Sequence, residues 1–206
     1  MVLPVVRFAA IVVLLWALPA VGQSSPAWIA ALQGGRHVIV LRHGATYADQ
    51  ADTNPLDLKD TAHQRQLNDA GRAAAKAMGD ALRKLKIPVG KVQTSLFQRA
   101  VETGTLLGAG EVSSTADISE GGLVVSPNEN NRRTAALRTL AATPPSAGTN
   151  VVLVSHKPNI MDAFGKDWFD VREGEASIFR PDGKGGYTLV ARVPAAEWTR
   201  LAQAAP

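Results

Sequence analysis

The chain has 206 residues, of which 46% are hydrophobic and 19% are charged, and its formal net charge is +4. This composition is typical of one folded globular domain and excludes a disordered or fibrous chain. Because the sequence contains no cysteine, disulfide bonds, a thiolate zinc site and a cysteine nucleophile are excluded as well. The basic residues are scattered and aromatic residues are few, so we expect no nucleic-acid-binding module.

The first 22 residues have the pattern of a secretory signal peptide. Arg7 precedes the apolar run FAAIVVLLWAL, and the following PAVGQ offers the small residues Ala20 and Gly22. The apolar run is shorter than the ~20 residues that a membrane-spanning helix requires. We therefore expect cleavage after Gly22, a periplasmic or secreted protein with no stable membrane insertion, and one catalytic domain over residues 23–206.

The first half of this domain predicts one strand, one long loop and one long helix. Residues 38–41 (VIVL) are continuously apolar and follow a Gly-Gly pair, which indicates a strand buried on both faces. Residues 44–66 are polar and show no period, as in a long loop. Asn68 has the character of a helix N-cap, and apolar residues then recur at helical spacing down to Leu85.

The second half continues the alternation of strands and helices. In order, we expect a strand at 91–95 (KVQTS), a helix at 97–108, a weak strand at 114–119 (STADIS), a helix at 129–142 capped by Asn128, a buried strand at 150–155 (NVVLVS), a helix from Pro158, a hairpin at 176–193 and a closing helix at 194–203. This order predicts an α/β fold, a three-layer α/β/α sandwich. Its central sheet is mostly parallel, with an antiparallel edge strand or hairpin near the C-terminus.

Three of the predicted strands end in cationic or reactive side chains. Arg42 and His43 follow the first strand, Arg99 lies just beyond KVQTS, and His156 follows NVVLVS. Because the carboxyl ends of parallel strands share one edge, we expect these four side chains to meet. Four such groups repel one another unless an anion neutralises them, and a tetrahedral phosphate can accept from all of them. The helix from Pro158 would add free backbone N–H groups.

The combination of motifs is more specific than any one of them. Arg-His-Gly at 42–44, TSLFQRAVET at 94–103 and VLVSH at 152–156 together resemble the histidine phosphatase superfamily, the group that includes the cofactor-dependent phosphoglycerate mutases. The segment LNDAGRAAA at 67–75 is similar to the helix start of that family. The resemblance spans about residues 36–193. It implies the phosphoglycerate mutase-like fold of branch 1 and, with the signal peptide, an exported bacterial phosphatase.

The resemblance also implies the roles of individual residues. His43 matches the histidine that is phosphorylated during turnover, and the phosphate-binding positions correspond to Arg42, Arg99 and His156. An acidic residue after the third strand commonly protonates the leaving group in this family. Glu120 is the preferred candidate here because it directly follows the predicted strand at 114–119, and Glu129 is the alternative. A neutral imidazole is a nucleophile that needs no metal, so no metal ion and no cofactor are expected.

The substrate is less defined than the chemistry. Mutases carry Glu or Gln, Ser or Thr, and Asn where this chain has Ala45, Thr46 and Asp49, so the substrate contacts of a mutase are not expected. With the predicted export, this favours a phosphomonoester hydrolase acting on a phosphorylated small molecule or a lipopolysaccharide sugar phosphate. The alternative is a catalytically silent sensor of the same fold that binds anions or phosphate. The sequence leaves the oligomeric state open.

Several polar residues are assigned no catalytic role. His37 lies at the far end of the first strand, and His63 lies in a polar loop without a partner at metal-ligand spacing. The aspartates of the long loop are expected to be solvated, although one of them could contact substrate: Asp49, Asp52, Asp57 and Asp60. The acidic segment EGEAS at 173–177 is a further candidate for lining the site.

Overall fold

The computed structural model describes residues 26–121 and 124–204, so the predicted signal peptide lies outside the described residues. Six strands form one sheet in the order β3-β2-β4-β1-β5-β6. In chain order they are β1 (Val38–Arg42), β2 (Val89–Thr94), β3 (Glu111–Ser114), β4 (Asn150–Ser155), β5 (Ala176–Pro181) and β6 (Tyr187–Val193).

The sheet is parallel over most of its width. Strand β4 pairs in parallel with both β1 and β2, and β2 pairs in parallel with β3. Strand β5 pairs antiparallel with β1 on one side and with β6 on the other. The predicted fold class is therefore confirmed, including the antiparallel hairpin at one edge.

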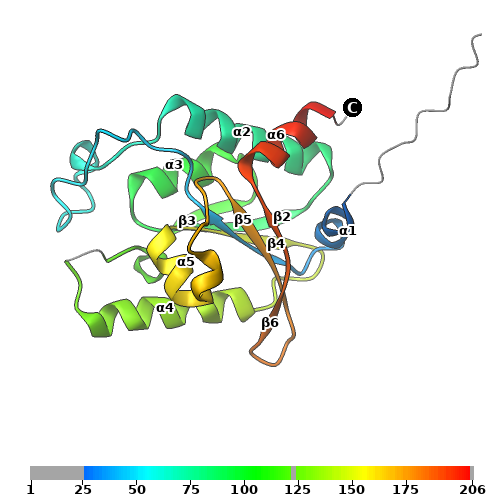
Figure 1. Ribbon diagram of the computed structural model, residues 1–206. Helices are drawn as coiled ribbons and strands as arrows, with labels where there is room; N and C mark the ends of the chain where they lie inside the picture. The colour runs from blue at the N-terminus through cyan, green and yellow to red at the C-terminus, as the bar shows by residue number, and fades with distance from the viewer. Residues whose placement is uncertain (1–25, 122–123, 205–206) are drawn as a thin grey trace, which may run out of the picture.

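The helices lie on both faces of this sheet and make the three layers. They are α1 (Ala27–Gln33), α2 (Asp69–Lys84), α3 (Gln98–Leu106), α4 (Pro127–Ala142), α5 (Lys157–Phe164) and α6 (Ala195–Ala204), with single 3₁₀ turns η1 (Thr61–His63), η2 (Ala116–Ile118) and η3 (Lys166–Trp168). Figure 1 shows α2, α3 and α6 above the sheet and α4 and α5 below it.

Strand β1 contributes to the core on both sides, as its continuous apolar run predicts. Ile39 and Leu41 belong to the core cluster beneath α2, α3 and α6, whereas Val38 and Val40 belong to the cluster packed against α4 and α5. All four side chains are at most 1% exposed. The alternation follows from the two-residue period of a strand. It determines toward which face of the sheet each side chain of β1 points.

Helix α2 begins where the sequence predicts. The side chain of Asn68 accepts a hydrogen bond from the Gly71 N–H at 2.8 Å, which caps the helix. Its amide group donates to the Thr46 carbonyl oxygen at 3.0 Å, and its own N–H donates to the Ala45 carbonyl oxygen. The capping residue therefore also holds the segment that follows β1 against the start of α2.

Two predicted details are wrong around the third strand and the helix after it. Residues 114–119 do not form a strand: β3 lies earlier, at Glu111–Ser114, and the side chain of Thr115 caps the 3₁₀ turn that follows. Strand β3 is an exposed edge strand, so it shows no apolar pattern by which it could be recognised. Helix α4 is capped by Ser126 instead of Asn128, because Pro127 occupies its first turn, where a missing N–H costs nothing.

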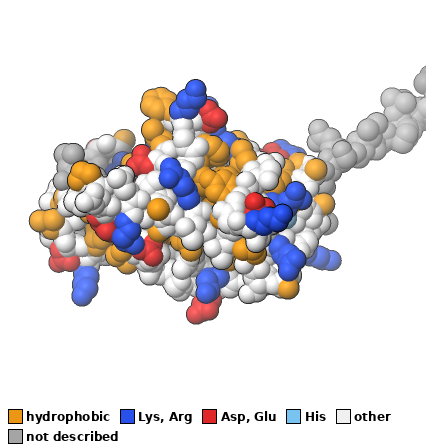
Figure 2. Space-filling view, turned by 90° about the horizontal axis from the view of Figure 1, so that it is seen from below, with side chains coloured by type: hydrophobic (Ala, Val, Ile, Leu, Met, Phe, Trp, Pro, Cys, Tyr) orange, Lys and Arg blue, Asp and Glu red, His pale blue; other side chains and the backbone are white. Residues whose placement is uncertain are grey.

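Surface charge is spread out on the face that Figure 2 shows, which is the face of α4 and α5. Lysine and arginine side chains lie there between acidic, apolar and neutral groups, without one continuous basic area. Within the described residues no helix is long and apolar enough to cross a membrane.

Candidate active site

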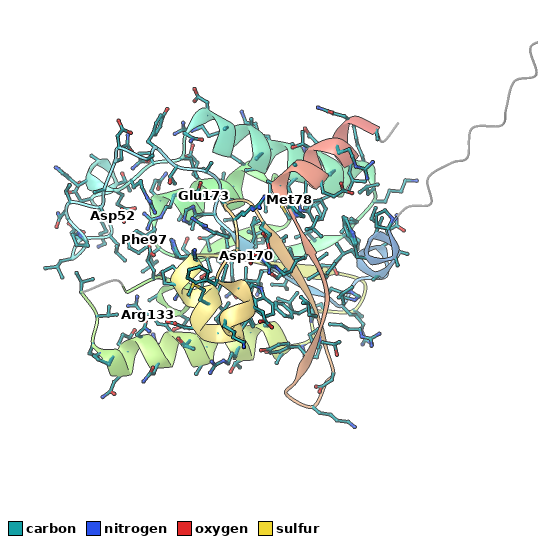
Figure 3. All side chains as sticks on the ribbon, in the orientation of Figure 1. Asp52, Met78, Phe97, Arg133, Asp170 and Glu173 are labelled. Carbon is teal, nitrogen blue, oxygen red and sulfur yellow. The ribbon has the colours of Figure 1, made fainter. Side chains whose placement is uncertain are left out.

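The carboxyl ends of β1, β2 and β4 bring the predicted residues together. The rings of His43 and His156 lie 5.1 Å apart, centroid to centroid, although the two residues are 113 positions apart in the sequence. Phe97, in the loop after β2, packs against both His156 and the guanidinium of Arg99. Figure 3 shows Asp52, Phe97 and Glu173 around this end of the sheet.

The backbone around His43 is held from three sides. The His43 N–H donates to the Ser155 carbonyl oxygen at the end of β4, and the Gly44 N–H donates to the hydroxyl of Thr103 on α3 at 3.0 Å. The Gly174 N–H donates to the carbonyl oxygens of Arg42 and His43. These contacts fix the position at which the histidine leaves the strand.

The side chain of His43 is buried, with only 2% of the residue exposed. The ring is buried although it follows a strand end, and the His156 ring packs against it. The Nδ1 atom lies 2.8 Å from the Gly44 carbonyl oxygen, which can only accept, so Nδ1 carries the proton. Burial and the neighbouring His156 lower the pKa of His43 well below its usual value. The Nε2 atom therefore keeps a free lone pair at neutral pH.

His156 is completely buried beside it and is also neutral at neutral pH. Burial, followed by the charge of Arg99, lowers its pKa well below the usual value. Its Nε2 atom lies 2.6 Å from the Ser95 hydroxyl, which itself accepts the Phe97 N–H. We assign the Ser95 hydroxyl proton to the bond with Nε2, which leaves the ring proton on Nδ1, where it has no hydrogen-bond partner among the described residues.

Arg99 is the buried cation of the site, with 0% of its side chain exposed. Its Nη1 donates to Asp52 at 2.9 Å, and its Nη2 donates to Glu120. A simple surface pair between Arg99 and Glu102 is excluded, because Glu102 accepts from Arg72 at 2.7 Å instead. Asp52 is thus one of the predicted loop aspartates that is not merely solvated.

Arg42 lies on the other side of the histidines. Its Nη1 donates to the Val171 carbonyl oxygen at 2.8 Å, and its Nη2 lies 3.4 Å from the Glu173 carboxylate. Glu173 also accepts from the hydroxyl of Thr46. The segment EGEAS therefore does line the site, through its first residue.

The two candidate acids lie in different surroundings. Glu120 contacts both Arg99 and His156, the latter at 3.4 Å from Nδ1, and 18% of its side chain is exposed. Glu129 instead binds Arg132 and Arg133 on its own helix, and the hydrogen bonds from these arginines lower its pKa to about 2. Of the two, only Glu120 lies within contact of the predicted phosphate-binding residues.

Buried donors of the site have no acceptor among the described residues. These are the Nε atoms of Arg42 and Arg99 and the Nδ1 atom of His156. Leaving a buried donor without an acceptor costs about 1–3 kcal/mol, so such a group indicates a ligand or water that completes it. Together these three donors, from the end of β1, the first turn of α3 and the residue after β4, form a site for an oxyanion.

The remaining histidines lie elsewhere, as expected. His37 is bound to the Gly35 carbonyl oxygen at the opposite end of β1, and His63 pairs with Asp60 in the exposed loop. In the described part of the chain no three His, Cys, Asp or Glu side chains are grouped so that they could hold a metal ion.

Sequence reasoning missed two residues that support the site. Ser95 orients His156, and Thr103 holds the backbone of Gly44. Both stand inside the motif TSLFQRAVET, so their place beside Arg99 was a signal that could have found them. Asp52 and Glu173, which hold the arginines, were named from the sequence only as members of acidic segments, because each reaches the site from a loop.

Comparison with known proteins finds a similar family and similar folds. Residues 38–124 match the family model of the histidine phosphatase superfamily (branch 1), the family that the sequence motifs resemble. A search of curated proteins found no match.

Solved structures share the fold at low sequence identity. The protein histidine phosphatase SixA, complexed with tungstate, is 19% identical over 78% of this chain and 97% of its own, with a TM-score of 0.55. A phosphoserine phosphatase mutant (H9A) from Entamoeba histolytica, in complex with phosphoserine, is 14% identical over 78% and 98%, with a TM-score of 0.52. A mycobacterial glucosyl-3-phosphoglycerate phosphatase is 16% identical over 78% and 98%, with a TM-score of 0.50.

Proposed function

We propose that this chain is a phosphomonoester hydrolase of the histidine phosphatase superfamily, branch 1, and that it acts through a phosphohistidine at His43. The observation that carries the proposal is the state of the His43 ring. Its Nδ1 proton is held by the Gly44 carbonyl oxygen, so Nε2 has a free lone pair, and the unpartnered donors of Arg42, Arg99 and His156 lie at the same edge of the sheet. The related folds named above include phosphatases, which supports the same reaction class.

The reaction has two steps. First, Nε2 of His43 attacks the phosphorus atom, the bond from phosphorus to the ester oxygen breaks, and Glu120 in its protonated form gives its proton to the departing oxygen. In the second step water attacks the phosphohistidine, the P–N bond breaks, and Glu120 takes a proton from the water. Arg42, Arg99 and His156 stabilise the charge on the phosphoryl oxygens in both steps.

The test is to trap the intermediate. Acid-labile, base-stable labelling of the protein by ³²P-labelled phosphomonoester, absent in His43→Ala, is the expected result. The wild-type chain should also hydrolyse p-nitrophenyl phosphate, and His43→Ala should lose at least roughly 10³-fold in kcat. A chain that binds phosphate but neither becomes labelled nor turns over would be the catalytically silent sensor, and the hydrolase proposal would be wrong.

We further propose that the enzyme acts outside the cytoplasm, after removal of residues 1–22. The support is the sequence pattern around Arg7 and Gly22. Expressed with its full sequence, the mature protein should be recovered from the periplasm with Gln23 as its first residue, as read by mass spectrometry. An intact Met1 in the cytoplasmic fraction would contradict this location. Phosphorylated envelope sugars, lipopolysaccharide sugar phosphates and small phosphomonoesters are the substrate classes to compare.

A further inference from the structure

The segment at residues 167–175, which leads from η3 to the start of β5, holds the guanidinium of Arg42. Its Val171 carbonyl oxygen accepts from Arg42 Nη1 at 2.8 Å, and its Glu173 carboxylate lies 3.4 Å from Arg42 Nη2. Each Nη atom therefore contacts this segment, whereas the buried Nε atom has no partner among the described residues. The shape of the segment determines where Arg42 presents that remaining donor.

Arg192, on β6, contacts the same segment at three points. Its Nη1 donates to the Asp167 carbonyl oxygen at 2.8 Å, its Nη2 to the Asp170 carboxylate at 2.8 Å, and its Nε to the Glu175 carboxylate at 2.6 Å. A planar guanidinium with five donors can hold three acceptors in one fixed arrangement. The three contacts flank the part of the segment that reaches Arg42.

Glu175 is a buried carboxylate that the proposed reaction does not use. The residue is 5% exposed, and burying a charge is costly unless it is paired and hydrogen-bonded. Besides the guanidinium of Arg192, it accepts the Arg172 N–H at 3.2 Å, and its own N–H donates to the Arg172 carbonyl oxygen at 3.0 Å. The pair of Glu175 and Arg192 therefore fixes the end of the segment that joins β5.

We propose that Glu175 and Arg192 are positioning residues for phosphate binding and that they act on Arg42 through the segment at residues 167–175. This inference rests on the proposed function, which assigns Arg42 to the phosphate. The pair holds the segment, the segment holds both Nη atoms, and the Nε donor is thereby oriented before an anion arrives. Donors that are already ordered bind more tightly, because less conformational freedom is lost on binding.

Two substitutions that change the charge in opposite directions test this inference. Arg192→Met and Glu175→Gln should each raise the Kd for inorganic phosphate by roughly tenfold, as measured by calorimetry. A long-range effect of charge alone predicts that the two variants differ in sign, because loss of the negative charge at Glu175 would strengthen anion binding. Tighter phosphate binding in Glu175→Gln would therefore overturn the inference.

The matched control is Arg138→Met. Arg138 also holds a backbone carbonyl oxygen, that of Ala163 at 2.6 Å, but it does so between α4 and α5. The substitution removes the same side chain and the same charge as Arg192→Met, and it should leave the Kd for inorganic phosphate unchanged. An equal rise of the Kd in Arg138→Met would mean that loss of any such arginine weakens the site.

A double-mutant cycle separates positioning from general destabilisation. In an Arg42→Met background the guanidinium is already absent, so adding Arg192→Met should cause no further rise of the Kd. An equal rise in both backgrounds, or an unchanged Kd in the folded single variants, would overturn the inference. Phosphate binding needs no turnover, so a wild type that shows these shifts but does not hydrolyse p-nitrophenyl phosphate would contradict the hydrolase proposal alone.

Discussion

His43 directly follows β1, and its side chain is buried. The carbonyl oxygen of the next residue, Gly44, fixes the proton on Nδ1. Three neighbouring segments hold the backbone, and burial together with the Nδ1 contact leaves the ring little freedom to turn. This suits the proposed role of His43, because a nucleophile whose orientation is set before substrate arrives loses less entropy in the transition state.

The proposed role of Glu120 as general acid can be tested by varying the leaving group of the substrate. Glu120→Gln removes the proton that the leaving group needs and leaves the unpartnered donors of the phosphate site in place. Hydrolysis of alkyl phosphates, whose alkoxide leaves poorly, should fall by roughly 10²- to 10⁴-fold. Hydrolysis of p-nitrophenyl phosphate should fall far less, because its phenolate leaves without a proton.

The matched control is Glu129→Gln. Among the described ion pairs, the Glu129 carboxylate contacts only Arg132 and Arg133, which lie on the same helix. It should change neither rate. Equal losses on both kinds of substrate in Glu120→Gln, or a loss that depends on the leaving group in Glu129→Gln, would show that the acid is assigned to the wrong carboxylate.

The first turn of helix α2 packs against the loop that carries His43. A Cβ at Gly71 would overlap the Ala45 carbonyl oxygen, and a Cβ at Gly44 would approach the Gly71 carbonyl oxygen. Two glycines therefore let the first turn of the helix lie directly against the end of β1. This contact gives a physical reason for the glycine of Arg-His-Gly and for the glycine of LNDAGRAAA.

Gly71→Ala should damage activity more than stability alone explains. We expect it to lower the free energy of unfolding by roughly 1–3 kcal/mol and to reduce kcat for p-nitrophenyl phosphate by roughly tenfold or more, because the loop at Ala45 must move. Denaturant unfolding and steady-state rates measure the two effects.

Gly79→Ala is the comparison for that prediction. Gly79 lies on the same helix and in the same kind of contact, but against the Leu107 carbonyl oxygen instead of the active-site loop. It should destabilise the protein to a similar extent and leave the kcat of the folded protein nearly unchanged. A similar loss of kcat in both variants would contradict a special role for the Gly44–Gly71 contact.

The whole molecule should lose stability in acid because of its two buried histidines. The pKa values of His43 and His156 are lowered in the folded state, mainly by burial. Below a pH of about 6.5 the unfolded chain therefore binds protons that the folded chain does not. As the pH decreases below this value, the free energy of unfolding should decrease by up to roughly 1.4 kcal/mol per pH unit for each histidine.

Urea unfolding between pH 7.5 and about pH 5 measures this slope. His156→Gln and His43→Gln should each flatten it, because each removes one buried imidazole. A slope that the two buried substitutions do not alter would mean that other groups carry the acid sensitivity.

The sequence by itself determined the layers of the fold and four of the site residues. Strand β1, the cap and length of α2, the second buried strand and the late hairpin all follow from local patterns, because each depends on nearby apolar period or capping chemistry. The placement of Arg42, His43, Arg99 and His156 at one edge follows from one rule about parallel strands. Strand β3 was misplaced because an exposed edge strand lacks an apolar pattern.

Only the tertiary structure decided which charges meet. Asp52 and Glu173 reach the arginines from loops whose course no local pattern encodes, and the distinction between Glu120 and Glu129 depends on which arginines lie beside each carboxylate. The burial of His43 likewise comes from segments distant in the chain that close over it. Strands and helices can be predicted from the short-range periodicity of the sequence. Ion pairs and burial depend instead on contacts between residues far apart in the sequence, and these contacts exist only once the sheet has formed.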